Sequence, residues 1–240
     1  MIQLAAEMER IKRIMVNKSN AFQSLIYSII AFVLLTTVAM LFYPGGKFFD
    51  HNSTGYSFFE NFYSDLGRYK TFSGGNKYIS TFFFIIAVFQ MCWFIVRFFN
   101  LFTEKISERK EYLFAKRLTK ISAATYGLLL STTAVTPYDR LFIYHALSAN
   151  LSFIVMIFVA VGVGYLTYKN KQFPKSYTVV FVLLALVLSF YMYLIFTVRS
   201  MVADANPYFH PTLQKIVVVC IIGSLVYLAV GCKKYLKTNI

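Results

Sequence analysis

Charged residues are scarce in this chain. Only 14% of its 240 residues are charged and 58% are hydrophobic, whereas a soluble domain carries about 25% charged residues. Uncharged apolar runs of about 20 residues recur, and each is long enough to cross the hydrocarbon core of a bilayer as a helix. Since unpaired backbone cannot face lipid, such runs form helices. The scarcity of charge therefore excludes an ordinary soluble domain and predicts an all-α, polytopic membrane protein.

Cysteines are few, and the common catalytic motifs are missing. Cys92, Cys220 and Cys232 fall within or at the end of predicted spans, so we expect no disulfide outside the membrane and see no zinc-ligand spacing. The sequence contains no Walker loop, no glycine-rich dinucleotide motif, no GxSxG elbow and no HExxH run. The familiar sequence signatures of nucleotide binding, serine hydrolysis and zinc proteolysis are therefore absent.

Acidic residues are outnumbered by basic ones, with 10 Asp and Glu against 24 Lys and Arg and a formal net charge of +14. The basic residues cluster in short segments beside the predicted spans and leave no separate basic domain. This distribution excludes nucleic acid as a partner and fits both membrane insertion and anionic lipid headgroups. The expected partners are membrane lipids, with a membrane-protein partner as an alternative.

Six spans follow from the apolar runs and the helix breakers between them. They cover residues 21–43, 78–99, 119–137, 141–168, 177–198 and 212–232, so the transmembrane domain runs from 21 to 232. Most Lys and Arg residues lie in the N-terminal tail, the 100–120 and 169–175 connections, and the C-terminal tail at 233–240. An excess of basic residues marks the cytoplasmic side. We therefore expect a multi-pass protein of the plasma (inner) membrane with both termini in the cytoplasm.

Residues 1–20 precede the first span and carry apolar side chains at helical spacing, with basic residues off that stripe. The stripe consists of Leu4, Met8, Ile11 and Met15. This pattern predicts a short amphipathic helix on the cytoplasmic membrane surface, with a frayed tail as the alternative. The segment lacks the uninterrupted apolar core and small-residue cleavage site of a signal peptide, so none is expected.

The predicted extracytoplasmic loop, residues 44–77, has helix signals of its own. Ser57 followed by Glu60 matches a capping box, and Gly67 stands where a left-handed residue ends a helix. These signals predict a short helix over residues 58–66. We therefore expect this loop to form a lid-like cover over the bundle.

Polar side chains gather on the predicted outer side. The loop supplies Asp65 and Arg68, and the corner that begins with Pro137 supplies Asp139 and Arg140. Polar groups within a span are costly against lipid, so they should face the bundle interior or a wet cavity.

The later spans add two histidines to this set. His145 lies in the fourth span with Ser148 and Ser152 on its helical face, while Asn150 points elsewhere; His210 opens the sixth span. We expect the titratable groups to converge near the outer leaflet with arginines around them. The converging groups are Asp65, Asp139, His145 and His210, and the arginines are Arg68, Arg140 and Arg199.

Three functions fit this constellation. The sequence favours a non-catalytic membrane protein that binds a lipid headgroup or a partner through its arginines, with no cofactor and with the carboxylates holding the loop to the helices. The alternative is a membrane-embedded, zinc-dependent lipid hydrolase, with Asp65, His145 and His210 as metal ligands and Asp139 as general base. The second alternative is a small-solute transporter, although charges at mid-membrane are scarce and no pair of matched broken helices is apparent.

Two stretches resemble a known family. ENFYSDLGRYKTFSGGN, after the first span, resembles the N-x-x-S-D-L-G signature of an uncharacterised prokaryotic six-span membrane family, the domain-of-unknown-function family 998. TPYDRLFIYHALSAN is similar to that family's proline–aspartate corner, which is followed by a histidine in span four. The resemblance implies a six-helix membrane protein with no assigned reaction. The chain is also distantly similar to Frag1/DRAM/Sfk1-type membrane proteins, some of which are tied to lipid remodelling. The matching positions are Ser64, Asp65, Leu66, Gly67, Pro137, Asp139 and His145.

Overall fold

The computed structural model describes residues 2–106, 110–197, 206 and 208–238. This part of the chain forms six long helices and two short 3-10 helices, with no β-strand beyond two isolated bridges. The predicted all-α fold is thereby confirmed. The long helices are α1 (Ile2–Leu41), α2 (Tyr78–Lys105), α3 (Leu113–Val135), α4 (Phe142–Lys169), α5 (Lys175–Thr197) and α7 (Phe209–Thr238), and the 3-10 helices are η1 (Tyr63–Gly67) and η2 (Lys110–Tyr112).

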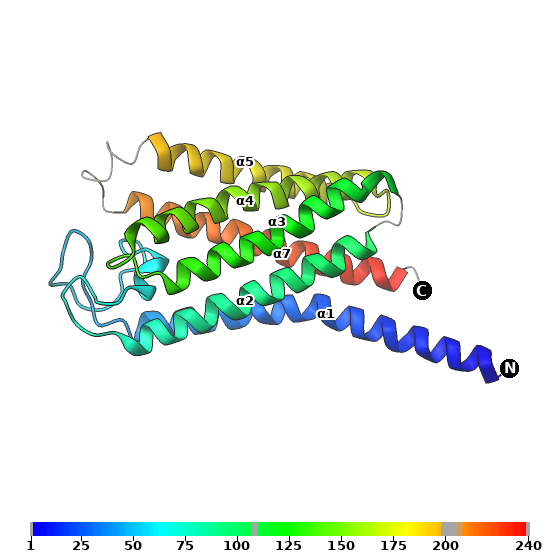
Figure 1. Cartoon of the computed structure of the whole chain (residues 1–240), viewed down its shortest axis with the longest axis horizontal. Helices are drawn as coiled ribbons and strands as arrows, with labels where there is room; N and C mark the ends of the chain where they lie inside the picture. The colour runs from blue at the N-terminus through cyan, green and yellow to red at the C-terminus, as the bar shows by residue number, and fades with distance from the viewer. Residues whose placement is uncertain (1, 107–109, 198–205, 207, 239–240) are drawn as a thin grey trace.

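The six long helices pack side by side and close into a ring (Figure 1). Each helix packs against its neighbour in the chain, and α7 closes the ring between α5 and α1. Both termini lie at one end of the bundle, here called the terminal end. The loop of residues 42–77 covers the opposite end, here called the loop end, and η1 within it contacts α2, α3 and α7. The fold therefore brings this loop against helices that are far apart in the sequence.

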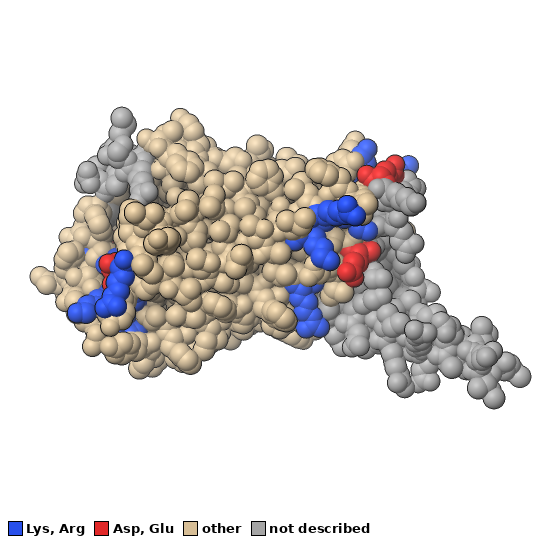
Figure 2. All heavy atoms as spheres, in the orientation of Figure 1, with Lys and Arg blue, Asp and Glu red and all other residues tan. Residues whose placement is uncertain are grey.

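The surface of the bundle has the character of a membrane protein. Among the described residues, five helices are long and apolar enough to cross a membrane: α2, α4, α5, α7 and the part of α1 from Phe22. Large apolar side chains point outward, such as Trp93 and Leu128, each 68% exposed. The face in Figure 2 carries its Lys and Arg side chains toward the two ends, and the middle is free of charge. The chain is therefore a multi-pass integral membrane protein.

Helix α3 packs between α2 and α4 but is less apolar than the other five. Its first turns carry Lys116, Arg117 and Lys120, which leaves an apolar stretch of residues 121–135. A Cβ atom at Gly162 of α4 would collide with Thr119 of α3, so glycine allows these two helices to approach closely. The place of α3 in the ring is therefore supported by this close packing.

Pro137 and Pro174 interrupt the helices between predicted spans, and Pro207, a third breaker in the sequence, lies outside the described residues. α3 ends at Val135, shortly before Pro137, and α5 begins at Lys175, directly after Pro174. A proline disfavours the helical conformation of the residue before it, which accounts for the end of α3. Pro211 lies in the first turn of α7, where its missing N–H breaks no helical hydrogen bond.

The N-terminal segment differs from its prediction. Residues 2–20 are helical, but they continue into the first span as the single helix Ile2–Leu41 instead of forming a separate short helix. No glycine or proline occurs before Pro44, so nothing in the local sequence interrupts the helical hydrogen bonds.

The predicted helix over residues 58–66 also differs. Only Tyr63–Gly67 is helical, as the 3-10 helix η1, and residues 58–61 form turns and a bend. The loop is therefore ordered by turns and tertiary contacts rather than by an α-helix of its own.

Candidate functional site

The loop of residues 42–77 is compact because glycines shape its turns. Gly45 and Gly46 have φ angles of +140° and +89°, which side chains on L-residues rarely allow. Gly45 also forms the isolated bridge to Thr54, and Lys70 forms a second one to Asn76. These two bridges fold the loop back over the end of the bundle.

Asp65 and Asn61 organise the interior of this loop. The Asp65 carboxylate accepts hydrogen bonds from the Phe62 N–H (2.9 Å) and the Asn61 amide (3.2 Å). Asn61 is 0% exposed and also donates to the Gly46 carbonyl (3.1 Å). Burial raises the pKa of Asp65 above its usual value, and these hydrogen bonds and the Arg68 cation oppose the rise. Asp65 therefore holds the loop together from within.

The capping box predicted at Ser57 is not formed. The Ser57 hydroxyl donates to the Glu60 carboxylate (2.7 Å), which also accepts from the Lys47 ammonium (2.8 Å). A capping box needs these side chains to bond backbone N–H groups instead. The hydrogen bonds from Lys47 and Ser57 hold the pKa of Glu60 below its usual value. Ser57 and Glu60 thus fasten the outside of the loop.

Gly67 is not the left-handed terminal residue that the sequence predicted. It is the last residue of η1, and its φ angle is not positive. A Cβ atom there would lie 2.8 Å from Cε1 of Phe84 in α2. Glycine is needed at this position for the close approach of the loop to α2.

Two buried lysines attach the loop to the helices, and sequence reasoning assigned neither of them a site role. Lys77 is 3% exposed, and its ammonium donates to the Asp65 and Leu66 carbonyls, both at 2.6 Å. Lys215 of α7 is equally buried and donates to the Asn61 carbonyl. Burial lowers the pKa of Lys77 from 10.5 to about 7, although the nearby Asp65 carboxylate raises it. A lysine beside an apolar run is the only signal that the sequence offers, and it normally indicates the membrane interface.

The corner between α3 and α4 fastens the loop from another side. The Pro137 carbonyl accepts the N–H groups of Arg140 and Leu141, which turns the chain into α4. Asp139 then accepts the backbone N–H groups of Tyr69 (2.8 Å) and Lys70 (3.0 Å). Partial burial raises the pKa of Asp139, but these two hydrogen bonds outweigh it and leave the pKa below its usual value.

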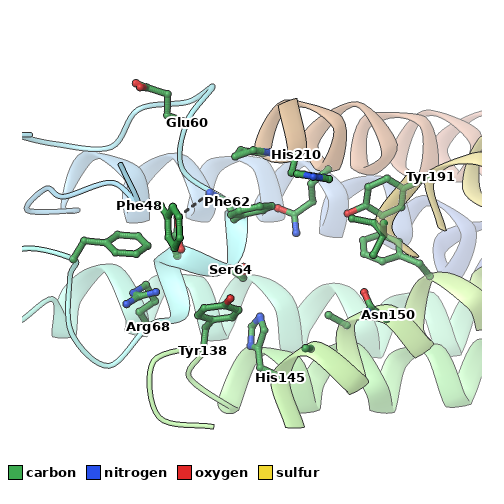
Figure 3. A pocket seen from close by; sticks show the side chains of 18 of the residues that line it. Phe48, Glu60, Phe62, Ser64, Arg68, Tyr138, His145, Asn150, Tyr191 and His210 are labelled. Carbon is green, nitrogen blue, oxygen red and sulfur yellow. Dashed lines mark hydrogen bonds between the residues drawn. The ribbon is translucent and has the colours of Figure 1, made fainter. Parts of the chain in front are cut away.

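A cavity of about 350 Å³ lies between the loop and the ends of α4, α5 and α7 (Figure 3). Of the four titratable residues expected to converge, Asp65, His145 and His210 line this cavity, and Asp139 does not. Figure 3 shows His145 and His210 on opposite walls. Within the described ranges, no three His, Cys, Asp or Glu side chains lie close enough together to hold a metal ion. The structure therefore brings three of the four titratable groups to one cavity and places Asp139 outside it, and the zinc site stays a prediction.

The wall supplied by α4 corrects one prediction. Its cavity-facing stripe contains His145, Ala149 and Phe153 at a spacing of four, together with Asn150. Asn150 was expected to point elsewhere, yet it lies at the far edge of this stripe and lines the cavity (Figure 3). Ser148 instead shares a hydrogen bond of 2.9 Å with Thr133, on the side where α4 packs against α3. The rotation of α4 in the bundle decides this choice, and the helical pattern alone cannot supply it.

His145 has a defined orientation within this wall. Its Nδ1 atom lies 2.7 Å from the Thr136 carbonyl oxygen. A carbonyl oxygen can only accept, so Nδ1 carries a proton and donates it. The other edge of the imidazole faces the space between the loop and the helix ends (Figure 3).

The three predicted arginines have different positions. Arg68 lines the cavity, is 8% exposed, and stacks with its Cζ atom 3.8 Å from the centroid of the Phe72 ring. Arg140 is exposed, stacks on the ring of Tyr69 at 3.3 Å, and does not line the cavity. Arg199 lies outside the described residues.

Arg68 uses only some of its N–H groups in hydrogen bonds to described residues. Its Nε donates to the Lys70 carbonyl (3.2 Å), whereas its terminal nitrogens make no hydrogen bond to any described residue. Nor does Arg68 form a salt bridge within the described part of the chain. The cavity therefore contains a buried guanidinium with donors available for a ligand.

Glu60 and Asn206 also line the cavity. Two further polar residues line it, and sequence reasoning assigned neither of them a site role. Ser64 and Gln214 both line the cavity. The Gln214 side-chain oxygen accepts the N–H of Tyr63 (3.0 Å), which ties the loop to α7 and leaves the amide nitrogen as a donor.

Comparison of this chain with family models, with curated proteins and with solved structures finds no match. The family resemblance described above therefore stays a prediction.

Proposed function

We propose that this chain is a six-span membrane protein that binds the anionic headgroup of a membrane lipid in the cavity at its loop end. In this proposal α3 also crosses the membrane and brings the five apolar helices to a total of six spans. The termini lie in the cytoplasm, and the cavity opens toward the outer leaflet of the plasma (inner) membrane. An even number of spans agrees with the two termini lying at one end of the bundle (Figure 1). The basic residues of the connections at that end support a cytoplasmic position.

The observation that carries the proposal is the environment of Arg68. A buried cation is costly unless it is paired, and this guanidinium has no salt bridge within the described residues. Stacking on Phe72 holds its plane in one orientation. The rigid fork of N–H donors matches a phosphate or carboxylate group, which accepts two parallel hydrogen bonds. An anion that enters the cavity would therefore complete the pairing of Arg68.

The shape of the cavity supports a lipid as the source of that anion. Arg68 and Tyr138 line it beside the loop, while Phe153 lines it 11 residues into α4, about 16 Å along the helix. Ile195 of α5 adds another apolar contact on the helix side. The cavity therefore combines a cationic group with apolar walls that reach into the bundle, as the headgroup and glycerol region of an amphiphile require.

Binding of purified lipids tests the proposal. Wild-type protein, Arg68→Gln and Arg140→Gln would be purified in mild detergent, and phosphatidylglycerol and phosphatidylcholine binding would be measured by native mass spectrometry. We expect the wild type to prefer phosphatidylglycerol and Arg68→Gln to bind it about tenfold more weakly, because charge-assisted hydrogen bonds are lost. Arg140→Gln is the matched control and should bind as the wild type does. Equal binding of both lipids by the wild type would overturn the proposal.

A further inference from the structure

We infer that His145 accepts a hydrogen bond from a hydroxyl group on the bound headgroup, so that the site selects a hydroxyl-bearing phosphate diester over one without a hydroxyl. The inference rests on the proposed function, because it concerns the same cavity and the same anion site at Arg68. It goes further by assigning the part of the ligand that lies beyond the phosphate.

The hydrogen bond of the imidazole to the backbone leads to this assignment. Nδ1 of His145 donates to the Thr136 carbonyl at 2.7 Å, which fixes the ring and places the proton on that side. A neutral imidazole that carries its proton on Nδ1 has a lone pair on Nε2. Nε2 is therefore an acceptor on the cavity wall (Figure 3).

The positions of Arg68 and His145 suit the two ends of one headgroup. Tyr138 lies between them, with its ring centroid 5.6 Å from that of His145 and 5.8 Å from the Arg68 Cζ atom. An anion at Arg68 and a hydroxyl at His145 would thus lie along the same aromatic surface. A short polyol esterified to a phosphate has both groups within one small unit.

The remaining polar groups favour a ligand with one negative charge. Asp65 and Glu60 also line the cavity, and their repulsion grows with each negative charge on the ligand, so a singly charged phosphate is repelled less than a doubly charged one. Asn150 and the amide nitrogen of Gln214 offer hydrogen bonds without charge. A phosphate diester with free hydroxyls matches this set better than a phosphate monoester with two charges.

Two lipids with the same charge separate the hydroxyl contact from the anion contact. Phosphatidylglycerol and phosphatidylethanol are both singly charged diesters, but only the first has headgroup hydroxyls. Their affinities, with phosphatidylcholine as the reference, would be measured by native mass spectrometry on the full chain. We expect the wild type to bind phosphatidylglycerol about tenfold more tightly than phosphatidylethanol, as one net hydrogen bond to a buried acceptor allows.

The variant His145→Asn sharpens this test. An asparagine amide can still donate toward the Thr136 carbonyl, but it lacks the acceptor at the position of Nε2. We expect this variant to bind the two anionic lipids equally, with unchanged affinity for phosphatidylethanol. His51→Asn is the control, since His51 stacks on Phe72 on the exposed side of the loop and does not line the cavity. It should keep the wild-type preference.

The outcomes distinguish the two proposals. If the wild type binds both anionic lipids equally and more tightly than phosphatidylcholine, the hydroxyl contact is overturned and the proposed function stands. If neither anionic lipid binds more tightly than phosphatidylcholine, the proposed function itself is overturned. A preference that survives in a folded His145→Asn variant also overturns the hydroxyl contact. The wild-type comparison needs no variant, so a variant that fails to fold leaves the test intact.

Soluble glycerophosphoglycerol separates the headgroup from the lipid. It carries the same diester and hydroxyls without acyl chains, so it lacks any contact of a lipid with the apolar walls. We expect it to displace phosphatidylglycerol only at a large excess. Displacement at equal concentration would overturn the claim that the bound diester belongs to a membrane lipid. The proposed contacts of the diester to Arg68 and His145 would still stand.

Discussion

The two ends of the bundle use their basic residues in different ways. At the loop end, Lys77 and Lys215 are 3% exposed and Arg68 is 8% exposed, and their partners are backbone carbonyls and aromatic rings. At the terminal end, residues such as Arg117 and Lys171 are exposed. Exposed cations on a membrane protein contribute to topology and to contact with anionic lipid. The buried lysines hold a loop in place, and the buried guanidinium of Arg68 bonds a described residue only through its Nε.

A count of Lys and Arg residues accounts for the role of the exposed cations at the terminal end. It does not account for the role of the buried cations at the loop end. Topology rules treat every lysine beside a span alike, which suits side chains in contact with water and headgroups. A buried ammonium has to be satisfied by specific acceptors, so its role depends on the surrounding fold. Two substitutions at the loop end and one dependence on pH test how far this difference extends.

The largest effect is expected from Lys77→Met. The variant keeps an apolar side chain of similar length but leaves the Asp65 and Leu66 carbonyls without their donor. Buried acceptors that lose their partners cost about 3 kcal/mol together. The free energy of unfolding in detergent would be measured at pH 10, where the cost of deprotonating Lys77 on folding is small. It would be compared with that of Lys120→Met at the terminal end, where the side chain is exposed and a change of about 0.5 kcal/mol or less is expected. Equal stability of the two variants would remove the distinction between the ends.

A smaller loss of folding stability is expected from Gly67→Ala, which tests whether packing against α2 also holds the loop in place. The added methyl group would meet the ring of Phe84 at 2.8 Å and push the loop away from α2. Overpacking of this kind costs about 2 kcal/mol. Gly223→Ala in α7 is the control, because a Cβ there meets nothing within 4 Å and alanine stabilises a helix by about 0.5 kcal/mol. If thermal unfolding shows no loss for Gly67→Ala, the loop is less tightly packed than proposed.

The smallest effect is a dependence of stability on pH that comes from Lys77. Its pKa is lowered to about 7 in the folded protein, against 10.5 in the unfolded chain. Between these values the unfolded chain binds the proton and the folded chain does not, so stability rises with pH. Asp65 acts with the opposite sign, and in a more acid range that begins at its ordinary pKa of 3.8. From pH 8 to pH 9 we expect the wild type to gain about 1 kcal/mol relative to Lys77→Met.

Parallel thermal unfolding of wild type and Lys77→Met in the same detergent at several pH values checks this expectation. The difference between the two proteins is the quantity to follow, because it removes the contributions of the other titratable groups. A difference that stays constant from pH 7 to pH 9 would mean that Lys77 is charged in the folded state. The loop end would then resemble the terminal end more closely than the buried position suggests.

Much of the candidate site was within reach of sequence reasoning, but its arrangement was not. Asp65, His145 and His210 were expected at one site, and all three line the cavity. Polar residues near the ends of apolar spans are few, which made them easy to select. Asp139 was placed with them, yet it bonds the backbone of the loop, because the direction of a side chain at a corner depends on what packs against it.

The helices themselves were determined by the sequence. An apolar run of about 20 residues has one stable form in lipid, because its backbone groups must bond within the run. The breakers Pro137 and Pro174 place the helix ends for a local reason, since a proline restricts the residue before it and lacks an N–H. The all-α class and the membrane location therefore required no knowledge of tertiary contacts.

Only the tertiary structure decided which residues share the cavity. Its walls come from the loop and from three helices, so its lining depends on the rotation of each helix and on the turns at Gly45 and Gly46. Asn61 donates to the Gly46 carbonyl at this turn, and Lys215, far away in the sequence, donates to the Asn61 carbonyl. A site assembled from distant segments is determined by the sum of such contacts. That is why Arg68 came to line the cavity while Arg140, from a similar position near the loop end, did not.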